Sequence, residues 1–141
     1  MAIKGLNLAA TRQFLSKFDD GDDPTVWEIG VLDSRTVGVI RDKALGIKVD
    51  QSNLDGNVET SIKQHEMNFN FVQFGVKGYS NLQDHSGTVL PYKTVKFQVG
   101  GGKAYKILDP EVLKVIPSAV IDELANEVLK DNEFTEVDEK N

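Results

Sequence analysis

The chain has 141 residues, enough for one domain with a single core or for a compact domain with a tail. Its 16 basic and 22 acidic residues give a net charge of −6, which argues against a general nucleic-acid binder, because affinity for the nucleic-acid backbone comes mainly from Lys and Arg. The lack of cysteine excludes disulfides and thiolate catalysis. The N-terminus has no apolar signal core, so we do not expect secretion. No apolar run approaches the roughly 18 residues that span a bilayer, so we do not expect a membrane partner.

The first 24 residues predict a short amphipathic stretch followed by a solvated loop. One or two helical turns are expected near residues 11–13. The apolar residues of this stretch are Leu6, Leu8, Phe14, Leu15 and Phe18. The run Asp-Asp-Gly-Asp-Asp-Pro over 19–24 cannot lie inside a helix or strand, so it indicates an exposed acidic loop.

A strand and a helix are expected next. Residues 25–32 place Trp27, Ile29 and Val31 on one face at period two, which is typical of a half-buried strand. Asp33 is a suitable N-cap, and residues 34–44 have the apolar spacing of a short helix.

The longest helical pattern begins near residue 57 and extends over about 18 residues. Its apolar stripe repeats at steps of four and three through Val58, Ile62, His65, Phe69, Val72 and Val76. Gly75 and Gly78 lie where such a helix would end. The following segment, 79–93, is polar and rich in turn formers, with a four-residue turn at 84–87.

The remaining segments predict a hairpin and a C-terminal helix. Residues 94–99 and 103–107 alternate as strands do, and three glycines at 100–102 suit the connecting turn. Asp109 and Pro110 form a helix-start signal, and Pro117 separates that short helix from a longer one over 118–130. Residues 131–141 are acidic with few apolar side chains, which predicts a flexible tail.

Together these elements predict an α+β fold: a small, mostly antiparallel sheet with a β-hairpin, packed by the central helix and the C-terminal helix. The strands are expected near 25–32, 88–99 and 103–108. We expect an N-terminal segment over 1–24, one domain over 25–130 and a tail over 131–141. The residues expected to be buried are Trp27, Ile29, Ile62, Phe69, Val72, Phe97, Ile107, Ile121, Leu124 and Val128.

No residue cluster predicts a catalytic, cofactor or metal site. His65 lies on the apolar stripe, where a structural histidine is the more frequent case. His85 stands between Asp84 and Ser86 in one turn, where adjacent residues cannot form a triad. The acidic loop lacks the ligand spacing of a calcium-binding loop. The segment 100–103 joins two strands, so it has no helix N-terminus to receive a phosphate. We therefore expect no enzyme activity and no cofactor.

The order of motifs from Phe71 to Ala125 resembles that of a group of phage proteins. A helix ending in Phe-Gly-Val-Lys-Gly-Tyr-x-Asn is followed by an Asp-x-x-Gly turn, a hairpin and a helix over 115–125. The opening Thr-Val-Trp-Glu-Ile-Gly-x-Leu-Asp over 25–33 fits the same order. The chain is similar, over about residues 25–130, to the small accessory proteins encoded with the structural genes of tailed bacteriophages. Some of those are tail-assembly chaperones, and others sit at the head–tail neck.

The resemblance implies a morphogenesis role, without catalytic residues to carry over. We expect a non-enzymatic tail-assembly chaperone that acts in the host cytoplasm and binds other phage structural proteins before they polymerise. The alternatives are a virion component of the neck or capsid surface, or an acidic host-directed regulator or inhibitor. A homo-oligomer is also compatible with the sequence.

Two segments are expected to contact partners. The hairpin offers a strand edge together with the side chains of Val95, Phe97 and Tyr105. The tail offers Phe134 as an apolar anchor, with Glu133 and Glu136 beside it for a basic rim.

Overall fold

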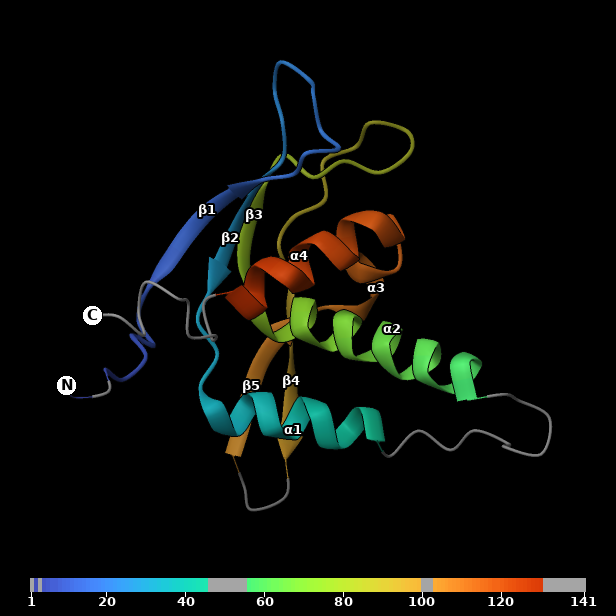
Figure 1. Cartoon of the computed structure of the whole chain (residues 1–141). Helices are drawn as coiled ribbons and strands as arrows, with labels where there is room; N and C mark the ends of the chain where they lie inside the picture. Colours follow the sequence, from blue (N-terminus) through green and yellow to red (C-terminus); the bar gives the residue numbers. More distant parts are fainter. Residues whose placement is uncertain (1, 3, 46–55, 100–102, 131–141) are drawn as a thin grey trace.

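A computed structural model describes residues 2, 4–45, 56–99 and 103–130. Its elements in chain order are β1 (Thr11–Leu15), β2 (Val26–Gly30), α1 (Ser34–Leu45), α2 (Gly56–Gly75), β3 (Val76–Ser80), β4 (Thr94–Val99), β5 (Lys103–Leu108), α3 (Pro110–Leu113) and α4 (Ser118–Lys130). The helices and strands form an α+β fold, as the sequence predicted (Figure 1).

The strands form two antiparallel sheets, whereas the sequence predicted one. The first sheet has the order β1-β2-β3, with Phe14 opposite Trp27 and Trp27 opposite Tyr79. The second sheet is the hairpin β4-β5, in which Phe97 lies opposite Tyr105. The strands predicted near 25–32, 88–99 and 103–108 are therefore present, but they belong to different sheets, and the second begins at Thr94 instead of near residue 88.

Two strands were missed. Residues 11–15, expected as helical turns, form β1, and the boundary expected at residue 24 falls between β1 and β2, which pair in one sheet. Residues 76–80, expected as a helix end and a polar segment, form β3. In both cases the strand is decided by pairing with β2, a partner that local periodicity does not reveal.

The predictions of the helices after residue 33 are confirmed. Asp33 begins α1, since its Oδ1 accepts a hydrogen bond from the backbone N–H of Thr36 at 2.7 Å. Asp109 caps α3 by accepting from the backbone N–H of Glu111 at 3.0 Å, and Pro110 occupies the first turn. Helix α2 ends at Gly75, and α4 covers residues 118–130 as expected.

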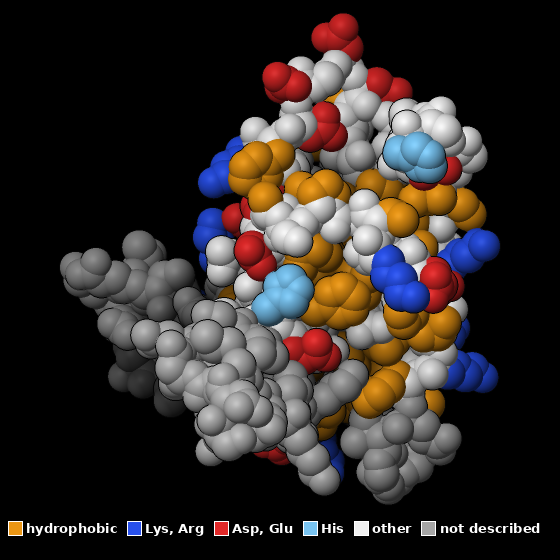
Figure 2. All heavy atoms as spheres, turned by 90° about the vertical axis from the view of Figure 1, so that its right-hand side faces the viewer, with side chains coloured by type: hydrophobic (Ala, Val, Ile, Leu, Met, Phe, Trp, Pro, Cys, Tyr) orange, Lys and Arg blue, Asp and Glu red, His pale blue; other side chains and the backbone are white. Residues whose placement is uncertain are grey.

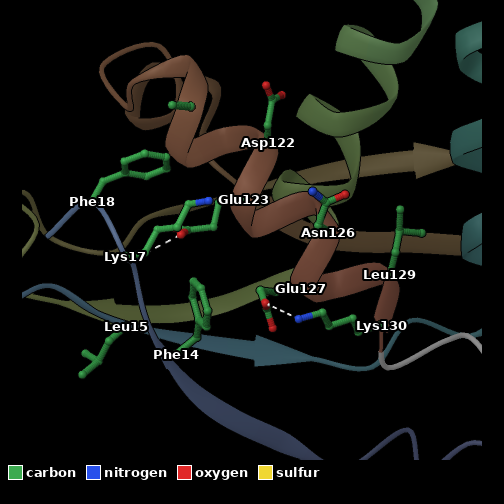
Figure 3. A pocket seen from close by; sticks show the side chains of 11 residues that line it. Phe14, Leu15, Lys17, Phe18, Asp122, Glu123, Asn126, Glu127, Leu129 and Lys130 are labelled. Carbon is green, nitrogen blue, oxygen red and sulfur yellow. Dashed lines mark hydrogen bonds and ion pairs between the residues drawn. The ribbon is translucent and has the colours of Figure 1, made fainter. Parts of the chain in front are cut away.

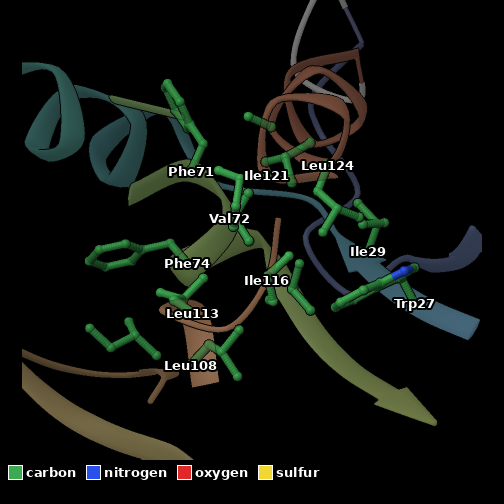
Figure 4. Packing of buried hydrophobic residues seen from close by; sticks show 14 of the residues in the cluster. Trp27, Ile29, Phe71, Val72, Phe74, Leu108, Leu113, Ile116, Ile121 and Leu124 are labelled. Carbon is green, nitrogen blue, oxygen red and sulfur yellow. The ribbon is translucent and has the colours of Figure 1, made fainter. Parts of the chain in front are cut away.

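The core lies where α2 and α4 meet β2, β5 and the α3 region (Figure 4). Of the predicted core residues, Trp27, Ile29, Val72, Ile107, Ile121, Leu124 and Val128 are buried. The side chain of Ile62 lies outside the described set.

The end of α2 is buried on more than the predicted stripe: Val72 and Val76 are buried as expected, but so are the residues between them. Every residue from Asn70 to Gly75 is buried, although Phe69 is only half-buried and His65 is exposed. The reason is that this end of α2 is surrounded by α1, α4 and the hairpin, so it has no single solvent face (Figure 1). Hydrogen bonds satisfy the polar groups there, as when Gln73 Nε2 donates to the backbone oxygen of Leu108 at 3.1 Å.

Gly75 allows α2 and α4 to approach closely. A Cβ atom at this position would lie 2.5 and 2.6 Å from the two methyl carbons of Val128, which is far inside van der Waals contact. Glycine is therefore required here for space.

Candidate functional site

The hairpin residues expected to bind a partner share one face of β4-β5, but that face is turned toward α2. Phe97 and Tyr105 are opposite one another across the two strands. The ring of Phe74 packs edge-on against both, with centroid distances of 5.7 Å in each case. Phe97 and Tyr105 are thus half-buried in the attachment of the hairpin to α2, while Val95 remains 36% exposed. The tail residues Glu133, Phe134 and Glu136 lie outside the described residues.

The histidine and acidic motifs do not form a reactive site. His65 and His85 are both exposed, and both are visible on the surface shown in Figure 2. Asp84 Oδ1 accepts hydrogen bonds from Ser86 Oγ at 2.7 Å, the Ser86 N–H at 2.9 Å and the Thr88 N–H at 3.0 Å. These bonds, first the one from the Ser86 side chain, lower the pKa of Asp84 and give it the role of closing its turn.

The acidic loop is also organised by its own backbone. Asp19 Oδ2 accepts a hydrogen bond from the Thr25 N–H at 2.9 Å, so this carboxylate closes the loop before β2.

Over the described ranges, no group of three or more His, Asp or Glu side chains is placed to hold a metal ion. Within the same ranges, no helix has the length and apolar character needed to cross a membrane.

A groove lies between the β1 end of the first sheet and α4 (Figure 3). It is open to solvent and has a volume of about 870 Å³. Phe14 points from β1 toward α4, and Phe18 lies near the start of α4. The residues that line it are Phe14, Leu15, Lys17, Phe18, Ala119, Asp122, Glu123, Asn126, Glu127, Leu129 and Lys130.

Two sets of polar contacts join β1 and the residues after it to α4. Arg12 Nη2 donates to Glu127 Oε2 at 2.8 Å and to the Glu127 backbone oxygen at 2.9 Å. Lys130 Nζ donates to Glu127 Oε1 at 2.8 Å. Burial acts to raise the pKa of Glu127, but the hydrogen bonds from Lys130 and Arg12 outweigh it and lower the pKa. Farther along, the Lys17 N–H donates to Glu123 Oε2 at 3.0 Å.

Two carboxylates of the groove, those of Asp122 and Glu123, form no ion pair with the described residues. Glu123 Oε1 is buried and has no hydrogen-bond partner within the described chain. Asp122 accepts only from Asn68 Nδ2, at 3.0 Å, in that same part of the structure. The groove therefore combines apolar side chains with two carboxylates that have no ion-pair partner among the described residues.

Exposed apolar side chains are frequent in the first 18 residues, and two of them, Leu15 and Phe18, belong to the groove. Leu15 and Phe18 are each 54% exposed, and Leu6 and Leu8, which precede β1, are 39% and 57% exposed. In contrast to Phe14, Leu15 points to the other side of β1 (Figure 3). Four of the seven large apolar side chains found exposed therefore lie within residues 6–18.

The apolar residues of this site belong to the amphipathic stretch expected from the sequence, which predicted helical turns near residues 11–13 where the structure has a strand. In the structure, positions 11–15 alternate between exposed and half-buried, as is typical of a strand. The sequence Thr-Arg-Gln-Phe-Leu does not show this alternation as hydrophobicity, because Arg12, one of the half-buried residues, is polar. The α4 carboxylates gave no signal, since acidic residues are frequent on any solvated helix face.

Comparison with known proteins gives no match: no family model, no curated protein and no solved structure is significantly similar to this chain.

Proposed function

We propose that this chain is a non-enzymatic morphogenesis protein of a tailed bacteriophage, most specifically a tail-assembly chaperone that acts in the host cytoplasm. Its role is to bind other phage structural proteins before they polymerise. The observation that carries the proposal is the exposure of Leu15 and Phe18, two large apolar side chains of the open groove between β1 and α4. The order of motifs that resembles phage accessory proteins supplies the biological context.

The chemistry of the site suits reversible binding of a protein segment. An assembly chaperone must cover apolar or strand-edge surface that would otherwise associate. Leu15 and Phe18 supply apolar contact area, and the edge of β1 supplies backbone donors and acceptors. The open shape of the groove favours release of the bound segment over permanent burial.

Deletion and single substitutions in a phage that encodes this chain test the proposal. Deletion is expected to leave filled heads without tails, and quantitative mass spectrometry is expected to find the protein in infected cells but not in purified particles. Phe18→Ser is expected to reproduce the tailless phenotype while leaving the purified protein folded, because Phe18 is half exposed.

Val115→Ser is the matched control, because Val115 is 55% exposed at a position outside the groove. Normal tails in the Phe18→Ser phage would contradict the assigned site. A stoichiometric amount of protein in purified particles would contradict the chaperone role and support the alternative of a virion component.

A further inference from the structure

We propose that the groove between β1 and α4 binds a partner segment in which a lysine or arginine lies next to a large apolar residue. The basic side chain pairs with Glu123, and the apolar one packs against Phe18. The inference rests on the proposed binding of client segments at this groove and adds the chemistry of those segments. Such a segment combines apolar area that leaves water with one charge that fixes its register.

The end of the groove near the start of α4 has the shape that a long basic side chain needs. Figure 3 shows Glu123 pointing from α4 toward Lys17, with Phe18 near the start of the helix. Ala119, one turn before Glu123, also lines the groove. The small alanine leaves room for the methylene stem of a lysine or arginine, and the half-exposed ring of Phe18 offers that stem apolar contact.

Glu123 carries an acceptor that the described residues leave unused. Its Oε2 accepts the Lys17 N–H at 3.0 Å, whereas its Oε1 is buried without a hydrogen-bond partner in the described chain. Buried polar groups are nearly always hydrogen-bonded, so this oxygen indicates a missing donor. The terminal torsion of a glutamate is broad, so the carboxylate can turn to meet a donor in the groove. A cationic donor suits it best, because charge-assisted hydrogen bonds are the strong ones.

Glu127 shows how this side of α4 holds a carboxylate when cations are within reach. It lies one turn after Glu123 and accepts from Arg12 Nη2 and from Lys130 Nζ, each at 2.8 Å. Glu123 and its neighbour Asp122 form no ion pair with the described residues. The charge of the groove is therefore balanced near the end of α4 and not near its start, where a cation of the partner complements it.

The basic residue in this part of the groove, Lys17, is directed to a ring and not to a carboxylate. Its Nζ lies 5.2 Å from the centre of the Phe18 ring, a distance typical of a cation–π contact. The corner formed by Phe18 and Glu123 thus already attracts an ammonium group of the chain itself. Lys17 is exposed and its stem is flexible, so it can move aside for the cation of a partner.

Peptide selection on the full chain tests this chemistry without a known partner. A library of random short peptides displayed on yeast is selected on the immobilised wild-type protein. We expect the selected peptides to be enriched in a lysine or arginine beside a leucine, isoleucine or phenylalanine. They are expected to bind Phe18→Ser at least about tenfold more weakly, because the apolar contact is lost.

The charge of Glu123 is tested with matched peptides and matched variants. A selected peptide, and its version with glutamine in place of the basic residue, are titrated by calorimetry against the wild type, Glu123→Gln and Glu111→Gln. On the wild type, loss of the basic residue is expected to weaken binding at least about threefold. On Glu123→Gln, which still offers an oxygen to the Lys17 N–H, the two peptides are expected to bind equally.

Glu111→Gln is the control for net charge, because an acidic chain attracts any cationic peptide at long range. Glu111 is exposed and lies outside the groove, so this variant is expected to behave as the wild type does. Circular dichroism establishes that the variants are folded. If Glu123→Gln does not fold, Asp122→Asn takes its place, since Asp122 is exposed on the same wall, and the difference between the two peptides is expected to shrink.

Four results would overturn the inference. The first is that no peptide is selected, as when another part of the chain or a second copy fills the groove. The second is that the selected peptides are not enriched in basic residues. The third is that Glu123→Gln and the wild type distinguish the two peptides equally, or that Glu111→Gln abolishes the difference as well. The fourth is that the peptides bind Phe18→Ser as they bind the wild type.

The phage experiment and the peptide experiment fail separately. Tailless Phe18→Ser phage, together with selected peptides that lack basic residues, would leave the chaperone role intact and overturn only the chemistry of the segment. Normal tails in that phage, together with the expected peptide preference, would contradict the phage role of the groove and leave its specificity for a basic and apolar segment standing.

Discussion

The contact between Gly75 and Val128 allows a quantitative test of the α2–α4 packing. Gly75→Ala adds one methyl group at the last residue of α2, at a site where both residues are buried. The new carbon would lie 2.5 and 2.6 Å from the two Val128 methyl groups, so one of the helices must shift. Val128 cannot rotate out of the way readily, because a β-branched side chain has one strongly preferred rotamer in a helix.

The expected loss of stability follows from two opposing effects. Overpacking a filled core costs about 1–3 kcal/mol. Replacing glycine by alanine within a helix gains up to about 1 kcal/mol, and less at a terminal position. The net expectation is a destabilisation of about 1–2 kcal/mol, which corresponds to a fall in Tm of roughly 2–8 °C for a domain of this size.

Urea denaturation of the wild type, Gly75→Ala, Val128→Ala and the double variant measures this coupling. Val128→Ala alone is expected to cost about 2 kcal/mol through loss of buried methyl groups. The double variant is expected to be more stable than the sum of the single effects by about 1 kcal/mol or more, because the smaller side chain at 128 makes room for the methyl group at 75. A Gly75→Ala protein as stable as the wild type, or strictly additive effects, would refute the close packing.

Three further predictions concern other contacts. Arg12→Met should lower the free energy of unfolding by about 1–2 kcal/mol, since it leaves Glu127 without one of its donors, and thermal unfolding checks this. Phe71→Ala should cost about 3–5 kcal/mol, whereas Phe69→Ala should cost clearly less in the same denaturation series, because Phe71 is fully buried and Phe69 is not. The pKa of Asp84 is lowered in the folded state, so its ionised carboxylate stabilises the turn at a pH above the ordinary pKa near 3.8. The turn should loosen as the pH falls through the lower folded-state pKa. Carboxyl NMR titration together with amide exchange in that turn would detect this change.

Local sequence patterns determined the helices, the hairpin and most of the core. The signals that begin and end helices act within one or two turns, so their effects can be predicted from neighbouring positions. Such signals are the caps Asp33 and Asp109, the proline at 117 and the glycine at 75. The alternation over 94–108 likewise reports a hairpin whose two strands are adjacent in sequence.

Only the tertiary structure decided the rest, because it depends on contacts between residues far apart in the chain. β1 is a strand because it pairs with β2 and because Arg12 reaches Glu127, 115 positions away. The last turns of α2 are buried on every side because three other elements surround them, which no single stripe can encode. The candidate site has the same origin: the apolar residues at 14–18 were visible in the sequence, but their groove exists only because α4 lies beside them.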